Sequence, residues 1–319
     1  IVSRESDGAS GWDHIYPGWP IANVLDATTR YKIEPAVVVD DPNFSATPLG
    51  TGLSSNTYKF IVSDKDQKIL VVPTDLGETH AYSINAGATW TSNSSFLRTG
   101  TSALGAIYTG QEFIIVGDST YYYTSQSGAL NDFVESSAAS TNYVSIASDG
   151  AGKVILVLDD GSVSYSSDHG ANYSSATGVA GSSAYGNNKF IIVSSTGDVA
   201  YSEDSGSSWT TTSLAISPSD WKVTYGNNRF VALGSNNKTA YSFDGITWYE
   251  SVIESDDTYD TISYGAGIFI ATGTSNKFAK TDDGNVWKTF TSDSTTYALS
   301  DNRVWGQMEY MPNTKNWIA

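Results

Sequence analysis

The chain has 319 residues and a formal net charge of −17, with 34 acidic residues, 17 basic residues, three histidines and no cysteine. Without cysteine there is no disulfide and no thiolate-bound metal, and the three histidines form no H-x-x-x-H pair. Phosphate binding takes clustered Lys and Arg, and a membrane span takes about 20 apolar residues. The composition therefore predicts no metal, no cofactor, no nucleic-acid partner and no membrane span.

The N-terminal part begins with a turn pattern and continues into a proline-rich stretch. Residues 5–12 (ESDGASGW) combine Asp, Gly and Trp at the spacing of a tight turn. Residues 13–56 contain Pro17, Pro20, Pro35 and Pro42, which favour an irregular extension. Gly8 and Gly87 are 79 positions apart, close to two units of the repeat described next, so a degenerate repeat unit here is the alternative.

A turn pattern recurs about every 40 residues between positions 57 and 290. Its fullest copy is YSEDSGSSW at 201–209, and related copies occupy 82–90, 123–128, 165–173, 241–248 and 280–287. An Asp or Asn side chain can accept hydrogen bonds from turn amides, and glycine takes the positive φ that a tight turn needs. The pattern predicts a series of hairpin turns.

A second element runs in phase with the first. YGNNKF at 185–190 matches YGNNRF at 225–230, and each copy leads into a β-branched and aromatic run such as FIIV at 190–193. No stretch shows an apolar period of 3.6 residues over a helical length. Each unit is therefore strand A, a Gly/Asn turn, strand B, a loop, strand C, an Asp/Gly turn and strand D. Four short antiparallel strands every 40 residues are typical of a β-propeller blade.

The positions of the turns predict an all-β fold, a single propeller domain with seven four-stranded antiparallel blades. Residues 57–290 supply six blades, and residues 1–12 and 291–319 share the closing blade. The extension at 13–56 is either irregular or a degenerate eighth blade.

The repeated pattern resembles the Asp-box, or bacterial neuraminidase repeat, of sialidases and sortilin-type receptors. The resemblance implies that the box is a structural turn between strands C and D, with the aromatic residue packed between blades. It assigns this structural role, and no catalytic one, to Asn85, Gly87, Trp90, Asp168, Gly170, Asp204, Gly206, Trp209, Asp244, Gly245, Trp248, Asp282, Gly284 and Trp287.

The same resemblance raises the question of sialidase activity. That chemistry needs three converging arginines, a Tyr/Glu pair and a general acid. The chain has five arginines, none in the Arg-Ile-Pro motif of that family. We therefore expect no true sialidase and no enzyme, with no catalytic residue assigned. The short polar B–C and D–A loops are compatible with glycan recognition and equally with plain loops, and no ligand-binding residue is assigned.

The Ser/Thr/Asn/Gly/Tyr-rich composition, the acidity and the short loops resemble phage virion proteins that carry such repeats. We therefore predict a non-enzymatic interaction module on a virion or cell surface, most simply a phage structural, tail-fibre or host-recognition protein. Its expected partners are other virion or surface proteins and host glycans. The alternative is a secreted propeller that binds carbohydrate or hydrolyses glycosides.

Overall fold

The computed structural model describes residues 2–5, 12–15, 31–33, 58–93, 97–129, 132–137, 139–214, 219–273, 277–291, 309–312 and 316–318. The chain forms two compact units, residues 1–45 and residues 46–319. In the first unit, β1 (Val2–Glu5) pairs antiparallel with both β2 (Trp12–Ile15) and β3 (Tyr31–Ile33).

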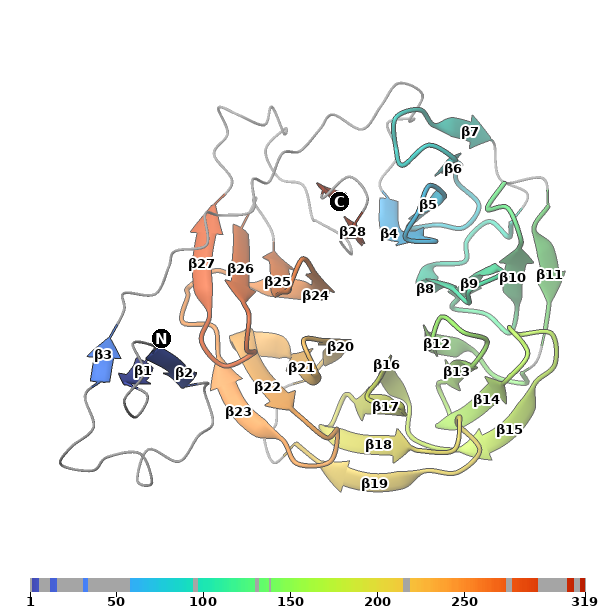
Figure 1. Cartoon of the computed structure of the whole chain (residues 1–319). Helices are drawn as coiled ribbons and strands as arrows, with labels where there is room; N and C mark the ends of the chain where they lie inside the picture. The colour runs from blue at the N-terminus through green and yellow to red at the C-terminus, as the bar shows by residue number, and fades with distance from the viewer. Residues whose placement is uncertain are drawn as a thin grey trace. The chain divides into compact units, whose positions relative to one another are not determined.

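The second unit contains six four-stranded antiparallel sheets, each made of strands consecutive in the chain (Figure 1). We number these blades 1 to 6 and call their strands A to D in chain order. Blade 1 is β4 (Tyr58–Ser63), β5 (Ile69–Pro73), β6 (His80–Ser83) and β7 (Thr91–Asn93). Blade 2 is β8 (Ala103–Tyr108), β9 (Phe113–Gly117), β10 (Tyr122–Ser125) and β11 (Val134–Ser136). Blade 3 is β12 (Tyr143–Ser148), β13 (Val154–Leu158), β14 (Ser162–Ser166) and β15 (Ser174–Thr177).

The remaining blades follow the same order. Blade 4 is β16 (Gly181–Gly186), β17 (Lys189–Ser194), β18 (Asp198–Ser202) and β19 (Thr210–Ser213). Blade 5 is β20 (Lys222–Gly226), β21 (Arg229–Leu233), β22 (Lys238–Ser242) and β23 (Tyr249–Val252), with the short 3₁₀ helix η2 (Ser235–Asn237) between β21 and β22. Blade 6 is β24 (Tyr259–Gly265), β25 (Ile268–Gly273), β26 (Lys277–Thr281) and β27 (Lys288–Thr291). The predicted propeller of four-stranded antiparallel blades is confirmed.

The predicted number of seven or eight blades is wrong: the described residues form six four-stranded blades. The A strands contact one another in series from β4 through β24. A two-stranded hairpin of β28 (Glu309–Met311) and β29 (Asn316–Ile318) follows, and β28 contacts both β24 and β4. β1 pairs with β2 and β3, and β29 pairs with β28, so the described strands include no pair between the two ends of the chain.

Apolar layers between neighbouring blades form the core. The B strands β5, β9 and β13 are buried at every position. Each lies inside its blade between strands A and C, and β9 and β13 also have a neighbouring blade on both faces. Between blades 3 and 4, for example, Ile155 and Val157 pack with Phe190 and Ile192. Comparable layers join blades 1 and 2, 2 and 3, 4 and 5, and 5 and 6. At about 25 cal/mol per Å² of buried apolar surface, these layers supply most of the stabilisation.

The A–B turn of one blade also binds the C–D turn of the next. Asn227 Nδ2 donates to the carbonyl oxygen of Asp282 at 2.8 Å, and Asn187 Nδ2 donates to that of Phe243 at 3.4 Å. Both asparagines have a φ of 47°, a left-handed conformation that Asn tolerates better than most residues. The repeated Asn thus has two functions, forming its own turn and fixing the adjacent blade.

The Tyr-Gly end of strand A is a further contact between blades. A Cβ atom added to Gly186 would lie 2.0 Å from the ring of Tyr225 in the next blade, and one added to Gly226 would lie 2.1 Å from the ring of Tyr264. The tyrosine rings therefore rest directly on the glycine backbone of the preceding blade. No other residue type leaves room for this contact.

Replacing Gly186 tests that contact. We expect Gly186→Ala to lower the free energy of unfolding by about 1–3 kcal/mol, because the methyl group overlaps the Tyr225 ring and one blade must shift. Urea unfolding measures the loss. Adding Tyr225→Ser should remove the overlap, so the double variant should lose less than the sum of the two single losses. Strictly additive losses would contradict the contact.

A buried histidine predicts the pH dependence of stability. His80 on β6 is fully buried, and burial lowers its pKa to about 4, although Nδ1 lies 3.2 Å from the carbonyl oxygen of Glu78. Between pH 6.5 and 4 the unfolded chain therefore binds more protons than the folded one, and stability falls as the pH falls through this range. The predicted loss over the whole range is roughly 3 kcal/mol.

We expect His80→Leu to flatten this part of the pH profile, because it removes the titrating group. Urea unfolding of both proteins at several pH values between 7 and 4.5 measures the effect. An equally steep decline in the variant would contradict the assignment to His80.

Candidate functional site

The residues predicted to form C–D turns do so through hydrogen bonds within each turn. In blade 4, the hydroxyl of Ser202 donates to Asp204 Oδ1 at 2.9 Å, and the Gly206 amide donates to Ser202 Oγ at 2.8 Å. The Ser208 amide and hydroxyl both donate to the same carboxylate. Despite partial burial, these donors hold the pKa of Asp204 well below its usual range. The carboxylate is thereby kept ionised and occupied by its own turn.

Equivalent turns occur in other blades. Ser166 and Asn172 donate to Asp168 and lower its pKa to about 2. Asp244 accepts bonds from Ser242 and from two turn amides, and in blade 1 the amide oxygen of Asn85 takes the same place. The glycines of these turns have positive φ, at Gly87, Gly170, Gly206, Gly245 and Gly284.

The prediction of Asp282 in this role is wrong, because its neighbour Asp283 occupies it. Thr281 Oγ1 donates to Asp283 Oδ1 at 2.9 Å, and the amides of Asn285 and Val286 donate to the same oxygen. Burial favours the neutral acid, but these amides outweigh it and lower the pKa of Asp283. Blade 6 has the one-residue-shorter turn of blade 5, in which the acceptor directly precedes glycine.

The tryptophans of the repeat pack against the apolar layers. Trp209, Trp248 and Trp287 contact the layers that join blades 3–4, 4–5 and 5–6, and Trp90 is buried in blade 1. Trp209 Nε1 also donates to the carbonyl oxygen of Gly206 at 3.0 Å. The C–D residues thus lie one set per blade, and the structure does not bring them together at one site.

The A–B turns contain the feature that the sequence analysis missed. Four blades end strand A with a tyrosine that packs on the first phenylalanine of strand B. The ring centroids are 4.7–4.9 Å apart in the pairs Tyr108–Phe113, Tyr185–Phe190, Tyr225–Phe230 and Tyr264–Phe269. Blades 1 and 3 lack this aromatic pair. At the same two positions blade 1 has Ser63 and Ile69, and blade 3 has Ser148 and Val154. Two rings are thereby missing on each of these blades.

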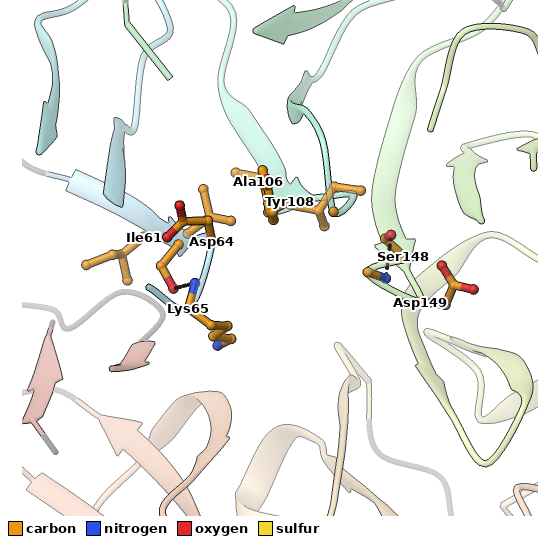
Figure 2. A pocket seen from close by; sticks show the side chains of 12 residues that line it. Ile61, Asp64, Lys65, Ala106, Tyr108, Ser148 and Asp149 are labelled. Carbon is orange, nitrogen blue, oxygen red and sulfur yellow. Dashed lines mark hydrogen bonds between the residues drawn. The ribbon is translucent and has the colours of Figure 1, made fainter. Parts of the chain in front are cut away.

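A pocket of about 510 Å³ lies at these turns. Figure 2 shows Asp64 and Lys65 on one side, Ser148 and Asp149 on the other, and Ala106 and Tyr108 between them. The complete lining is Ile61, Val62, Ser63, Asp64, Lys65, Ala106, Ile107, Tyr108, Gly110, Ser148, Asp149 and Gly150. The pocket therefore belongs to the A–B ends of blades 1, 2 and 3, and not to the B–C and D–A loops, whose composition is compatible with glycan recognition.

Hydrogen bonds within the turns fix the polar edge of this pocket. Asp64 Oδ1 accepts from the amides of Asp66, Gln67 and Lys68 at 2.9–3.0 Å. Asp149 Oδ1 likewise accepts from two amides of its own turn. Ser63 Oγ accepts a hydrogen bond from the Lys65 amide, and Ser148 Oγ accepts one from the Gly150 amide. The lining is thus preorganised, with apolar side chains below a rim of carboxylates and turn backbone.

The aspartates also affect the neighbouring tyrosines. Partial burial raises the pKa of Tyr108, and the negative charge of Asp64 raises it further. Burial and the charge of Asp149 act in the same way on Tyr185. Both phenols stay protonated, and Tyr108, which lines the pocket, offers it a neutral hydrogen-bond donor.

Other predicted features fall outside this pocket. Arg98 forms an ion pair with Glu135 at 2.9 Å, and Arg229 donates to the carbonyl oxygen of Asp283, so these two arginines do not converge. Arg30 and Arg303 lie outside the described residues, and the absence of sialidase activity stays a prediction. The described part of the chain holds no group of three metal-ligating side chains and no helix able to cross a membrane.

The architecture defines the chain as a β-propeller, and comparison with solved structures agrees. It is similar to the structure described as "YCF48 bound to D1 peptide", with a TM-score of 0.62 and 15% identity over 81% of this chain and 87% of that one. It is also similar to YCF48 from Cyanidioschyzon merolae, with a TM-score of 0.59 and 12% identity over 81% and 91%. At this identity the similarity shows the fold alone. No protein-family model and no curated protein matches the chain, so Asp-box family membership stays a prediction.

The correction in blade 6 has a direct mutational test. Asp283→Ala leaves turn amides unpaired, so we expect a loss of about 1–3 kcal/mol in the free energy of unfolding. Asp283→Asn should lose less, because an amide oxygen serves this purpose at Asn85. Asp282→Ala, a change at an exposed side chain, should stay within about 0.5 kcal/mol. Chemical denaturation of the three variants measures these losses of unfolding free energy. A larger loss for Asp282→Ala than for Asp283→Ala would restore Asp282 as the acceptor in this turn.

Proposed function

We propose that this chain is a non-enzymatic protein-interaction module that holds a segment of a partner polypeptide in the pocket at the A–B ends of blades 1–3. The single observation that carries the proposal is the pocket's origin. Ser63 and Ser148 line it, and they stand where four other blades have the tyrosine of the Tyr–Phe pair. A repeat that loses its own packing residues in the two blades flanking blade 2 loses stabilisation there, which a bound partner can restore.

The dimensions and chemistry of the pocket support this proposal. Its volume lies in the range of ligand-binding cavities and fits a few side chains. Apolar residues such as Val62 and Ala106 provide a surface for side chains, while the turn backbone at Gly150 lies open to a second backbone. The similar structure of YCF48, described as bound to a peptide, supports a polypeptide ligand for this type of propeller.

The hydrogen bonds of the aspartates support a non-enzymatic function. Glycoside hydrolysis needs two carboxyl groups, one of them a protonated acid. Asp64 and Asp149 each use Oδ1 to accept backbone amides of their own turns, so this oxygen of each carboxylate is already occupied. The alternative of a carbohydrate-binding or glycoside-hydrolysing propeller stays a prediction.

We further propose that the module is located on a virion or cell surface. The net charge of −17 suits an exposed module, because it opposes self-association. A phage structural or host-recognition protein, with virion proteins and host glycans as partners, stays a prediction. Co-purification of the chain with intact virions would support this placement, and its absence from them would oppose it.

Selection of binding peptides tests the proposed function. A random peptide library displayed on mRNA is selected against the whole chain, and the affinities of the enriched peptides are measured by fluorescence anisotropy. We expect Ser148→Tyr to weaken binding at least tenfold, because the added ring occupies the pocket. Ser174→Tyr, the same substitution at an exposed position of β15, is the matched control and should leave affinity unchanged.

Two outcomes would contradict the proposed function. One is a library that yields no binding peptide. The other is a set of peptides that bind the Ser148→Tyr variant as tightly as the unchanged chain.

A further inference from the structure

We infer that the pocket is specific for an aromatic side chain of the partner, which takes the place of the tyrosine rings that blades 1 and 3 lack. The inference rests on the proposed function and adds the chemistry of the ligand. Its basis is the chain itself, because four other blades show which group fills this position.

The four complete blades provide the template. In each, a tyrosine ring lies against a phenylalanine ring at 4.7–4.9 Å between centroids, with interplanar angles of 47–59°. Tilted aromatic pairs at this distance gain more than their buried area alone provides. At Gly186 and Gly226 the ring of the next blade also covers the backbone directly. The A–B end of this propeller is thus built to bury rings.

The two incomplete blades keep the surroundings but lack the rings. Ser63 and Ser148 occupy the tyrosine position, and their small side chains turn back to accept the amides of Lys65 and Gly150. Tyr108, the one aromatic residue of the pocket lining, lies between these blades (Figure 2). A ring from a partner would therefore meet both apolar side chains and the ring of Tyr108.

The mouth of the pocket leaves a path for the partner's backbone. Gly150 has a φ of 70° and no atom within 4 Å of the place where a Cβ would lie. Gly110 also lines the pocket, but the carbonyl oxygen of Gly150 covers it, 2.3 Å from the place where a Cβ would lie. A second backbone can therefore approach closely at Gly150 while its side chain enters the pocket.

Small amino-acid amides test this specificity without a known partner. N-acetyl-tyrosinamide, N-acetyl-phenylalaninamide and N-acetyl-leucinamide are titrated into the whole ¹⁵N-labelled chain, and the amide shifts of Gly110 and Gly150 are followed by NMR. Gly267 is the internal control, because it is an exposed positive-φ glycine in the A–B turn of blade 6, which keeps its aromatic pair.

We expect saturable shifts at Gly110 and Gly150 with the two aromatic amides, at dissociation constants at least fivefold below that of the leucine amide. Gly267 should not respond. Ser148→Tyr should abolish the shifts, and Ser174→Tyr should preserve them. Equal affinity for the leucine amide, an equal response at Gly267, or no saturable shift at all would overturn the inference.

The peptides selected from the library separate this inference from the proposed function. If they depend on Ser148 but show no enrichment of Phe, Tyr or Trp, the pocket binds polypeptide without aromatic specificity and only the inference fails. If no peptide depends on Ser148, both fail. Enrichment of aromatic residues together with dependence on Ser148 supports both.

Discussion

A four-stranded blade with two apolar faces cannot bury both of them alone, and every other feature of this propeller depends on that constraint. Each blade gains its burial from its two neighbours, so Phe190 and Ile192 are covered by residues of blade 3 while Ile191 and Val193 pack toward blade 5. At the surface, hydrogen bonds between the A–B turn of one blade and the C–D turn of the next hold adjacent blades in the same relative position. Closure through β28, which contacts both β24 and β4, leaves neither end of the series of A strands without a neighbour.

Local turn chemistry made most of this fold predictable from the sequence. The Asp/Gly and Gly/Asn turns and the β-branched runs between them are short-range signals, and they predicted the six blades within residues 57–290. The count failed at the ends, because the turn pattern at 5–12 identifies a tight turn without identifying the pairing partners of its strands. β1 pairs with β2 and β3, a long-range choice that no local pattern contains. Asp282 and Asp283 are adjacent, and only the length of the turn decides which carboxylate reaches the amides.

The pocket was missed for a different reason. Sequence reasoning followed the residues that recur, whereas the pocket lies where recurrence breaks down. Ser63 and Ser148 stand where four other blades have tyrosine, and this departure is visible in the sequence once strand A is aligned across all six blades. In a repeat protein most recurring residues serve packing. A position whose residue departs from the repeat and no longer packs is therefore a good candidate for a functional residue. The buried Tyr122 and Tyr123, by contrast, both serve packing, Tyr122 in the layer between blades 2 and 3 and Tyr123 in the layer between blades 1 and 2.

Hydrogen–deuterium exchange with a selected peptide tests most directly whether the interrupted aromatic series forms the binding site. The account predicts slower exchange at the A–B turns of blades 1, 2 and 3, at residues 61–65, 106–110 and 148–150, with little change at the corresponding turns of blades 4, 5 and 6. Protection spread evenly over all six A–B turns, or confined to the B–C and D–A loops at the opposite end, would contradict it.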